Sequence, residues 1–211
     1  MKSIAENPLN IPPHAPVMAL PNAVLFPNAL LPLYIFEPRY RAMLAHCLEQ
    51  QRMFCIGHMR PGVTEARSLA DLYPVAGLGL VRACVARDDG TSHLVLQGLV
   101  RVRLRGVVQD APFRIAEIQA LAPGRAKPEH APELVAEVLE LCSGLQPGVN
   151  AAENLHSQLA NVGEPDVLAD VVAHTFLRDP HARQEVLEAV PVQERMETLI
   201  RHLRTEAGQA M

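Results

Sequence analysis

A cysteine and a histidine stand three residues apart in Cys55-Ile-Gly-His58, a spacing that resembles a metal-binding motif. Both residue types are common ligands of Zn²⁺, which needs side chains that converge on one point. The surrounding apolar residues predict a strand, and residues three apart in a strand point to opposite faces. We therefore expect no metal site and no cofactor here. Four other histidines fall in helical patterns without a cysteine or histidine four residues later, and we expect them to be solvated or to cap helices: His46, His174, His181 and His202.

Only two residues could serve as a phosphate-binding or catalytic lysine, because Lys2 and Lys127 are the only lysines in the chain. A P-loop places a lysine after a glycine-rich turn, in the pattern Gly-x-x-x-x-Gly-Lys-Ser/Thr, to hold nucleotide phosphates. Neither lysine stands in that pattern. The sequence therefore predicts no ATP hydrolysis.

Three arginines alternate along a predicted strand at Arg101, Arg103 and Arg105, so their side chains share one face. Such a stripe could bind phosphates or acidic peptide segments. The simpler interpretation, which we favour, is the solvent-facing side of a half-buried strand. Nucleic acid is further disfavoured by the net charge of −4 and by the lack of tryptophan, with only three tyrosines available to stack on bases.

Glu37 is a carboxylate with informative neighbours, since Pro38 follows it directly and Arg39 and Arg41 come shortly after. It could complement the positive end of a helix that begins at Pro38, or pair with an arginine of the predicted strands such as Arg101. A catalytic role needs a second acid–base group, and no carboxylate or histidine is positioned nearby in sequence. We therefore expect no catalytic residue.

A long loop runs from Met59 to Tyr73. Long loops on rigid scaffolds often carry recognition, and methionine side chains adapt to varied apolar partners. The loop could therefore offer an apolar peptide-binding surface, made of Met59, Val63, Leu72 and Tyr73. The alternative is a loop that merely folds back on the scaffold.

The first half of the chain predicts a small barrel with one helix inserted early. Apolar residues repeat with helical spacing from Pro38 to Gln50, and proline suits the first turn of a helix. Asp89-Gly90 predicts a hairpin turn, because glycine accepts the positive φ of such turns. Short strands are predicted before, around and after these elements, at 17–35, 53–59, 75–87, 92–97, 100–108 and 113–121. So many short, mostly antiparallel strands favour a closed or nearly closed barrel.

The second half predicts an antiparallel helical bundle. Residues 122–130 combine prolines, a glycine and charges, as in a linker. Helical stripes follow at 134–145, around Leu155 and Leu159, at 167–177, from Asp179-Pro180 onward, and at 192–204. We therefore divide the chain into a barrel at 1–122 and a bundle at 123–211, and expect limited proteolysis to cut first at the joint or in the long loop.

Composition limits the class of protein. Apolar residues make up 49% of the 211 residues and charged residues 20%, as in a packed globular protein. Cys47, Cys55, Cys84 and Cys142 are widely spaced among apolar residues, which predicts reduced, buried thiols. The first residues lack the apolar core of a signal peptide, and the apolar runs are too short to span a bilayer. We expect a soluble cytoplasmic protein that does not enter membranes.

The order of several motifs resembles the N-terminal, substrate-binding domain of the Lon protease family. They are the proline-broken strands at 17–35, Phe36-Glu37-Pro38-Arg39-Tyr40, Asp71-Leu72-Tyr73 before Val75, the run 97–104, Leu168-Ala169-Asp170, the run 184–188, and Glu194-Arg195-Met196-Glu197. The resemblance implies an α+β fold, a PUA-like antiparallel β-barrel followed by a C-terminal helical bundle. In full-length relatives this region engages unfolded or degron-bearing proteins.

The resemblance covers the recognition part of such a protease without its catalytic parts. The family's protease uses a serine with a lysine as base, and neither Lys2 nor Lys127 lies in a suitable context. Our leading hypothesis is a non-catalytic module that binds unfolded or apolar polypeptide segments or a partner protein, between barrel and bundle or along the long loop. The alternative is an RNA-binding module, since PUA-like barrels also bind RNA. Weak self-association stays open.

Overall fold

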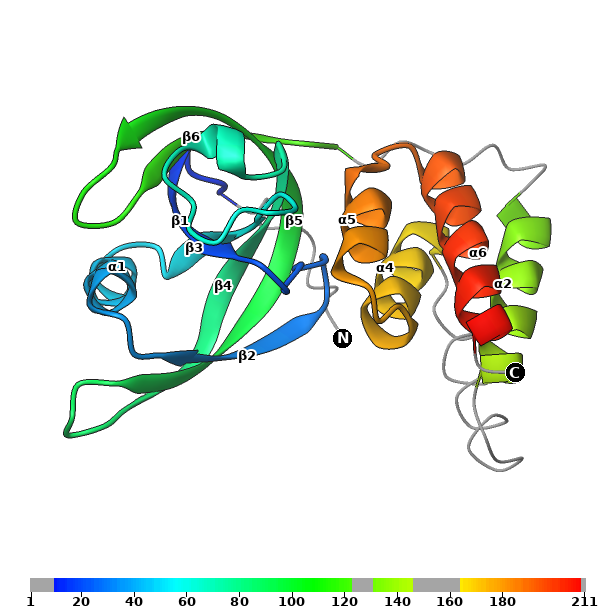
Figure 1. The fold of residues 1–211 in the computed structure, drawn as a ribbon, viewed down its shortest axis with the longest axis horizontal. Helices are drawn as coiled ribbons and strands as arrows, with labels where there is room; N and C mark the ends of the chain where they lie inside the picture. The colour runs from blue at the N-terminus through cyan, green and yellow to red at the C-terminus, as the bar shows by residue number, and fades with distance from the viewer. Residues whose placement is uncertain (1–9, 123–130, 146–163, 210–211) are drawn as a thin grey trace, which may run out of the picture.

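The computed structural model describes residues 10–122, 131–145 and 164–209. Lys2, Lys127, nearly all of the predicted linker and the helix predicted around Leu155 and Leu159 lie outside these residues. Figure 1 shows a curled sheet on one side of the molecule and a layer of helices on the other. The α+β class that the sequence predicts is confirmed.

The sheet has six strands in the order β2-β5-β4-β3-β1-β6. An additional pairing of β5 with β6 joins β5, β4, β3, β1 and β6 in a barrel and leaves β2 outside it at the edge of the sheet. The strands are β1 His14–Leu20, β2 Leu30–Ile35, β3 Met53–His58, β4 Val75–Ala86, β5 Ser92–Gln109 and β6 Ile115–Ala120. β5 is one strand of 18 residues, where the sequence predicted two. Its length lets it pair with β2, β4 and β6. The barrel is also not purely antiparallel, because β1 runs parallel to β3.

Helix α1, Pro38–Glu49, follows β2 and packs on the barrel as its periodicity predicts. Its buried residues are Tyr40, Met43, Leu44 and Cys47. These positions recur at helical spacing, so one stripe faces the sheet while the opposite face stays in water. Proline at the first turn costs nothing, because the N–H it lacks has no partner within the helix.

The glycines of β4 and β5 allow the chain between β1 and β2 to pass directly over the sheet. A Cβ on Gly77 would overlap the carbonyl of Leu25, and one on Gly98 would overlap the carbonyl of Phe26. The backbone of Leu25 and Phe26 therefore approaches strands that are more than fifty residues away in sequence. Both side chains are fully buried, so this crossing segment helps to fill the core.

The helical half contains α2 Ala131–Leu145, α4 Pro165–Phe176, α5 Pro180–Glu188 and α6 Val192–Gln209. They match the predicted helices at 134–145, at 167–177, from Pro180 and at 192–204. Asp179 caps α5 by accepting a hydrogen bond from the backbone N–H of His181 at 3.0 Å. No helix in the described part is long and apolar enough to cross a membrane.

Barrel and bundle share one of the hydrophobic clusters of the protein. Phe26 and Val75 of the barrel half belong to the same buried cluster as Leu168 of α4 and Val186 of α5. In Figure 1, α5 and α4 are the helices nearest the barrel, while α2 lies on the far side of α6. The two halves predicted from sequence are therefore joined by buried apolar contacts as well as by the chain.

Candidate functional site

An apolar sheet face is exposed where β2, β5 and β4 lie side by side. Two cross-strand rows form it, and we call it the outer apolar face. One row is Pro32, Val95 and Ala83, and the other is Tyr34, His93 and Val85. Side chains alternate along a strand, so residues between these positions point inward, as the buried Leu94 and Leu96 do.

Aromatic rings gather at one end of the outer apolar face. The ring of Tyr34 stacks on that of His93 with centroids 4.7 Å apart, and on that of Phe36 at 5.7 Å. Tyr34 is 47% exposed, Phe36 58% and Val85 66%. Large apolar side chains left open to water on neighbouring strands commonly mark a binding surface.

A groove of about 400 Å³ lies on this face. Its lining comprises the six residues of the outer apolar face with Leu33 and Leu94, and none of them is Asp, Glu, Lys or Arg. A surface without fixed charge complements apolar, uncharged groups and gives phosphates nothing to pair with. The groove therefore suits hydrophobic side chains.

The long loop was predicted to offer a peptide-binding surface of four residues, and this prediction is wrong for two of them. Met59 is 6% exposed and Leu72 only 1%, and both belong to the buried core of the barrel. Met59 and Leu72 also form a β-bridge with each other across the base of the loop. Val63 and Tyr73 are half-buried, and peptide binding by these two stays a prediction.

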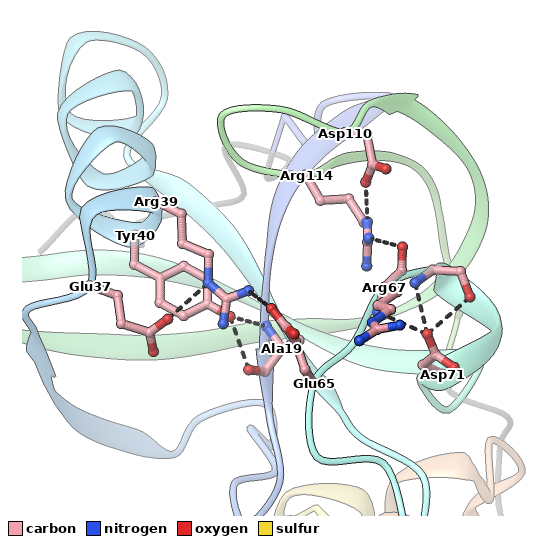
Figure 2. Close-up of polar contacts among 10 residues, drawn as sticks. Ala19, Glu37, Arg39, Tyr40, Glu65, Arg67, Asp71, Asp110 and Arg114 are labelled. Carbon is pink, nitrogen blue, oxygen red and sulfur yellow. Dashed lines mark hydrogen bonds and ion pairs between the residues drawn. The ribbon is translucent and has the colours of Figure 1, made fainter.

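The loop folds back on the barrel and is fixed by polar contacts. Arg60 Nε donates to the carbonyls of Ala70 and Leu72, at 3.0 and 3.1 Å. The Asp71 carboxylate accepts hydrogen bonds from the backbone N–H groups of Ser68 and Arg67, and these bonds lower the pKa of Asp71. In Figure 2 Arg114 reaches this loop from the barrel, where it donates to the Arg67 carbonyl at 2.7 Å.

The motif Phe36-Glu37-Pro38-Arg39-Tyr40 is structural. Glu37 accepts a hydrogen bond from Arg39 Nε at 2.9 Å. Arg101 bonds Asp170 instead, so the alternative that paired Glu37 with Arg101 is wrong. The hydroxyl of Tyr40 donates to the carbonyl of Ala19 and accepts from its N–H, at 3.1 and 3.2 Å. Figure 2 shows Tyr40 reaching from α1 to β1, while Arg39 also approaches Glu65 of the loop. These contacts hold the start of α1 against the barrel and the loop.

The predicted arginine stripe is not one exposed surface. Arg101 is 4% exposed and donates from Nη1 to the carboxylate of Asp170 on α4 at 2.8 Å. Arg103 is half-buried, whereas Arg105 is exposed and donates from Nε to Gln119 at 3.0 Å. The interpretation of this face as the solvated side of the strand is wrong for Arg101 as well, because the bundle covers it.

Comparison with known proteins identifies the family. The family model described as the ATP-dependent protease La (LON) substrate-binding domain matches residues 14–205. The chain belongs to the Lon substrate-binding domain family. Curated relatives include a Lon protease of Desulfosudis oleivorans, 26% identical over 92% of this chain and 24% of that protein. Lon protease 2 of Syntrophobacter fumaroxidans is 28% identical over 84% of this chain and 22% of that protein. The chain thus spans about a quarter of the length of these relatives.

Solved structures show the same fold as this Lon-type domain. The N-terminal domain of the Mycobacterium avium complex Lon protease matches with a TM-score of 0.73 at 17% identity, covering 90% of this chain and 98% of that one. The Lon N-terminal domain protein from Xanthomonas campestris matches with a TM-score of 0.65 at 21% identity, covering 89% and 97%. These likenesses support the fold.

Three aromatic residues meet where the barrel of the Lon-type domain touches its bundle. The Tyr73 hydroxyl lies 2.8 Å from Nδ1 of His181 on α5, and the ring of His58 stacks on Tyr73 with centroids 5.3 Å apart. His58 is 2% exposed. Burial, and then the charge of His181, lowers the pKa of His58. Tyr73 and His181 thus take part in the contact between the two halves. The His181 side chain therefore does more than face water or cap a helix, the two roles that we predicted for it.

The described residues do not meet the requirements of a metal site. No group of three or more His, Cys, Asp or Glu residues in the described part could hold an ion. Cys55 and His58 are both buried in β3, where Cys55 belongs to the hydrophobic core.

The outer apolar face of the Lon-type domain was missed by reasoning from the sequence. Residues 29–36 read as one continuous apolar run, which does not show that one side of the strand is open to water. The available signal was Pro32, because proline inside a strand is tolerated mainly at the edge of a sheet.

Proposed function

We propose that this chain is a non-catalytic recognition module that binds unfolded or apolar polypeptide segments on the outer apolar face. The single observation that carries the proposal is this uncharged face of Tyr34, Val85 and their neighbours, left exposed beside a groove of about 400 Å³. Membership of the Lon substrate-binding domain family supports a role in recognising protein substrates. A folded protein keeps its own apolar side chains buried, so the face would select chains that have lost their fold.

The expected affinity is modest. Burial of apolar surface contributes about 25 cal/mol per Å², and the face can bury only a few side chains of a bound segment. Ordering an unfolded chain offsets much of that gain, which leaves dissociation constants on the order of micromolar. Such binding would resist salt, because it does not depend on charge.

RNA binding is the competing function, and the placement of the arginines weakens it. Arg101 would have to leave a buried carboxylate before it could reach a phosphate. RNA held by surface arginines would also dissociate as salt rises, because counterions compete for the phosphates. Salt dependence therefore separates the two functions.

Fluorescence anisotropy with a labelled, permanently unfolded protein tests the proposal at low and high salt. We expect micromolar binding at both, and at least about ten-fold weaker binding by the double variant Tyr34→Ser/Val85→Ser. Val108→Ser is the matched control, because Val108 is 56% exposed but lies outside the outer apolar face. A labelled single-stranded RNA is titrated in parallel.

Two results would contradict the proposal. One is salt-sensitive RNA binding together with no binding of the unfolded protein. The other is equal loss of binding in the double variant and in Val108→Ser, which would show that any exposed apolar side chain matters. ATP hydrolysis or casein cleavage by the purified chain would overturn its assignment as non-catalytic.

The cysteines fit the cytoplasmic location that we propose. Cys47, Cys55 and Cys142 are buried free thiols and Cys84 is a half-buried one. Reduced thiols of this kind are the rule in reducing compartments.

A further inference from the structure

β2 lies at the margin of the sheet, as Figure 1 shows, and β5 is its only strand partner in the described part of the chain. The carbonyl of Ala29 accepts a hydrogen bond from Gly98 N at 2.8 Å, so Ala29 faces β5. In an antiparallel pair the backbone groups of successive residues alternate in direction. The backbone groups of Leu30, Pro32 and Tyr34 therefore point away from β5. Outside the β2–β5 pairing, no hydrogen bond from another described residue reaches them.

The same residues carry exposed apolar side chains. Leu30 is 55% and Tyr34 47% exposed, and Pro32 lies between them on the same side of the strand. Backbone groups without a partner among the described residues and an apolar surface thus coincide along one edge. An extended polypeptide complements both at once, because it offers backbone partners along its length and side chains on alternate sides.

We propose that a bound polypeptide segment adds an antiparallel strand to β2 and lays its apolar side chains on the outer apolar face. This inference rests on the proposed function and specifies its binding mode. In an antiparallel pair, directly opposed residues share a face and can exchange both hydrogen bonds. The residues opposite Leu30 and Tyr34 are therefore the apolar residues of the bound segment.

The lining of the groove restricts which residues the bound segment can have. Its lining has no charged side chain, so the segment has apolar residues at every second position and no charge on that side. A lipid tail or a small apolar molecule could cover the groove, but it would leave the outward N–H and C=O groups of Leu30 and Tyr34 without partners. The edge therefore favours a peptide over other apolar ligands.

Pro32 limits the strength of this pairing. It offers an outward carbonyl but has no N–H, so a bound strand loses one hydrogen bond in the middle of the edge. Proline at an edge strand also protects against uncontrolled pairing between sheets. Two copies of this chain that paired through β2 would each lack that donor, which disfavours a second copy as the occupant. The result is weak, reversible capture.

N-methylated peptides test the binding mode. The probe is a labelled eight-residue peptide of alternating valine and serine, compared with two derivatives that carry three N-methyl groups on either the valine or the serine amides. Methylation of the valine amides should weaken binding at least about ten-fold, because these N–H groups face β2. Methylation of the serine amides should change it less than about two-fold, and equal methyl counts control for chain stiffness.

Pro32→Ala gives an independent readout on the protein. It restores an outward N–H on an exposed residue, so the unmethylated peptide should bind about five-fold more tightly. Equal effects of the two methylation patterns, or a loss confined to the serine set, would overturn antiparallel strand addition. So would sedimentation showing a dimer that the peptide does not dissociate, which would assign the edge to a second copy.

The outcomes separate this inference from the proposed function. If the unfolded protein binds and Tyr34→Ser/Val85→Ser weakens it, while methylation has no positional effect, strand addition is wrong and the proposed function stands. If the double variant leaves binding of the unfolded protein unchanged, the proposed function itself fails at this face.

Discussion

Arg101 of β5 and Asp170 of α4 form a buried, bidentate ion pair across the contact between barrel and bundle. Arg101 is 4% exposed and Asp170 2%. Arg101 Nη1 donates to Asp170 at 2.8 Å, its Nη2 donates to the second carboxylate oxygen, and its Nε donates to the carbonyl of Leu187 on α5 at 2.9 Å. Arg195 of α6 approaches the same carboxylate at 3.5 Å. One carboxylate thus links the barrel to two helices of the bundle.

Asp170→Ala should be among the most destabilising substitutions in the chain. It would leave two buried guanidinium groups without their carboxylate, and a broken buried pair typically costs about 3–5 kcal/mol. Burial, and then the charge of Arg101, already lowers the pKa of Arg195 to about 10. Urea unfolding followed by circular dichroism measures the effect.

Two further variants test whether the loss of stability in Asp170→Ala comes from the broken ion pair. Arg101→Leu should cost less than Asp170→Ala, because Asp170 would keep Arg195 nearby. Arg105→Ala is the control, since its exposed side chain bonds only Gln119 among the described residues and its loss should change stability by less than about 0.5 kcal/mol. An Asp170→Ala midpoint as high as that of Arg105→Ala would show that the pair does not hold the two halves together.

Acid should destabilise the protein through His58. Its pKa is lowered in the folded state, so the unfolded chain binds more protons once the pH falls below about 6.5. The free energy of unfolding should therefore decrease with falling pH in this range, by up to about 1.4 kcal/mol per pH unit for one proton. His58→Phe keeps an aromatic ring against Tyr73 and should flatten this slope between about pH 7 and 5.

Urea midpoints at several pH values check the His58 prediction against two other histidines. Burial, and then the charge of Arg183, lowers the pKa of His174, so His174→Phe should remove a separate part of the slope. His14→Gln, at an exposed position, is the control. An unchanged slope in His58→Phe would refute the role of His58.

Two glycine-to-alanine substitutions should have opposite effects. A methyl group on Gly77 would overlap the Leu25 carbonyl, so Gly77→Ala should cost about 1–3 kcal/mol or more. At Gly144 in α2 an added Cβ has no neighbour within 4 Å, and Gly144→Ala should stabilise by about 0.5–1 kcal/mol. Thermal unfolding measures both, and a neutral Gly77→Ala would mean that the crossing segment can move away from β4.

Alkylation should distinguish the cysteines. Burial raises the pKa of Cys47 and of Cys142 to about 12, and it also raises the pKa of Cys55. Because the thiolate is the reactive form, these three should resist iodoacetamide in the folded protein. Cys84 is only half-buried and should react first. Peptide mass spectrometry before and after denaturation checks the order, and early labelling of Cys55 would show that the barrel opens.

Local sequence patterns determined the individual elements. Helix α1 could be predicted because its buried residues repeat at 3.6-residue spacing, which depends only on near neighbours. The hairpin at Asp89-Gly90 could be predicted for the same reason, and Gly90 has the positive φ of 79° that such a turn needs. The order of such elements also sufficed to indicate the family and its α+β fold, since neither requires knowing which faces are covered.

Tertiary structure alone decided which strand faces meet water. Alternation in β5 placed Arg101 with Arg103 and Arg105, but only Arg101 of the three is buried, where it bonds Asp170 from 69 residues later in the chain. The sequence likewise did not show that the barrel core covers Met59 and Leu72, or that Tyr34 stays 47% exposed. Periodicity shows that two sides of a strand differ, whereas burial depends on what distant segments pack against each side. The candidate binding face therefore emerged only once β2, β4 and β5 were seen together.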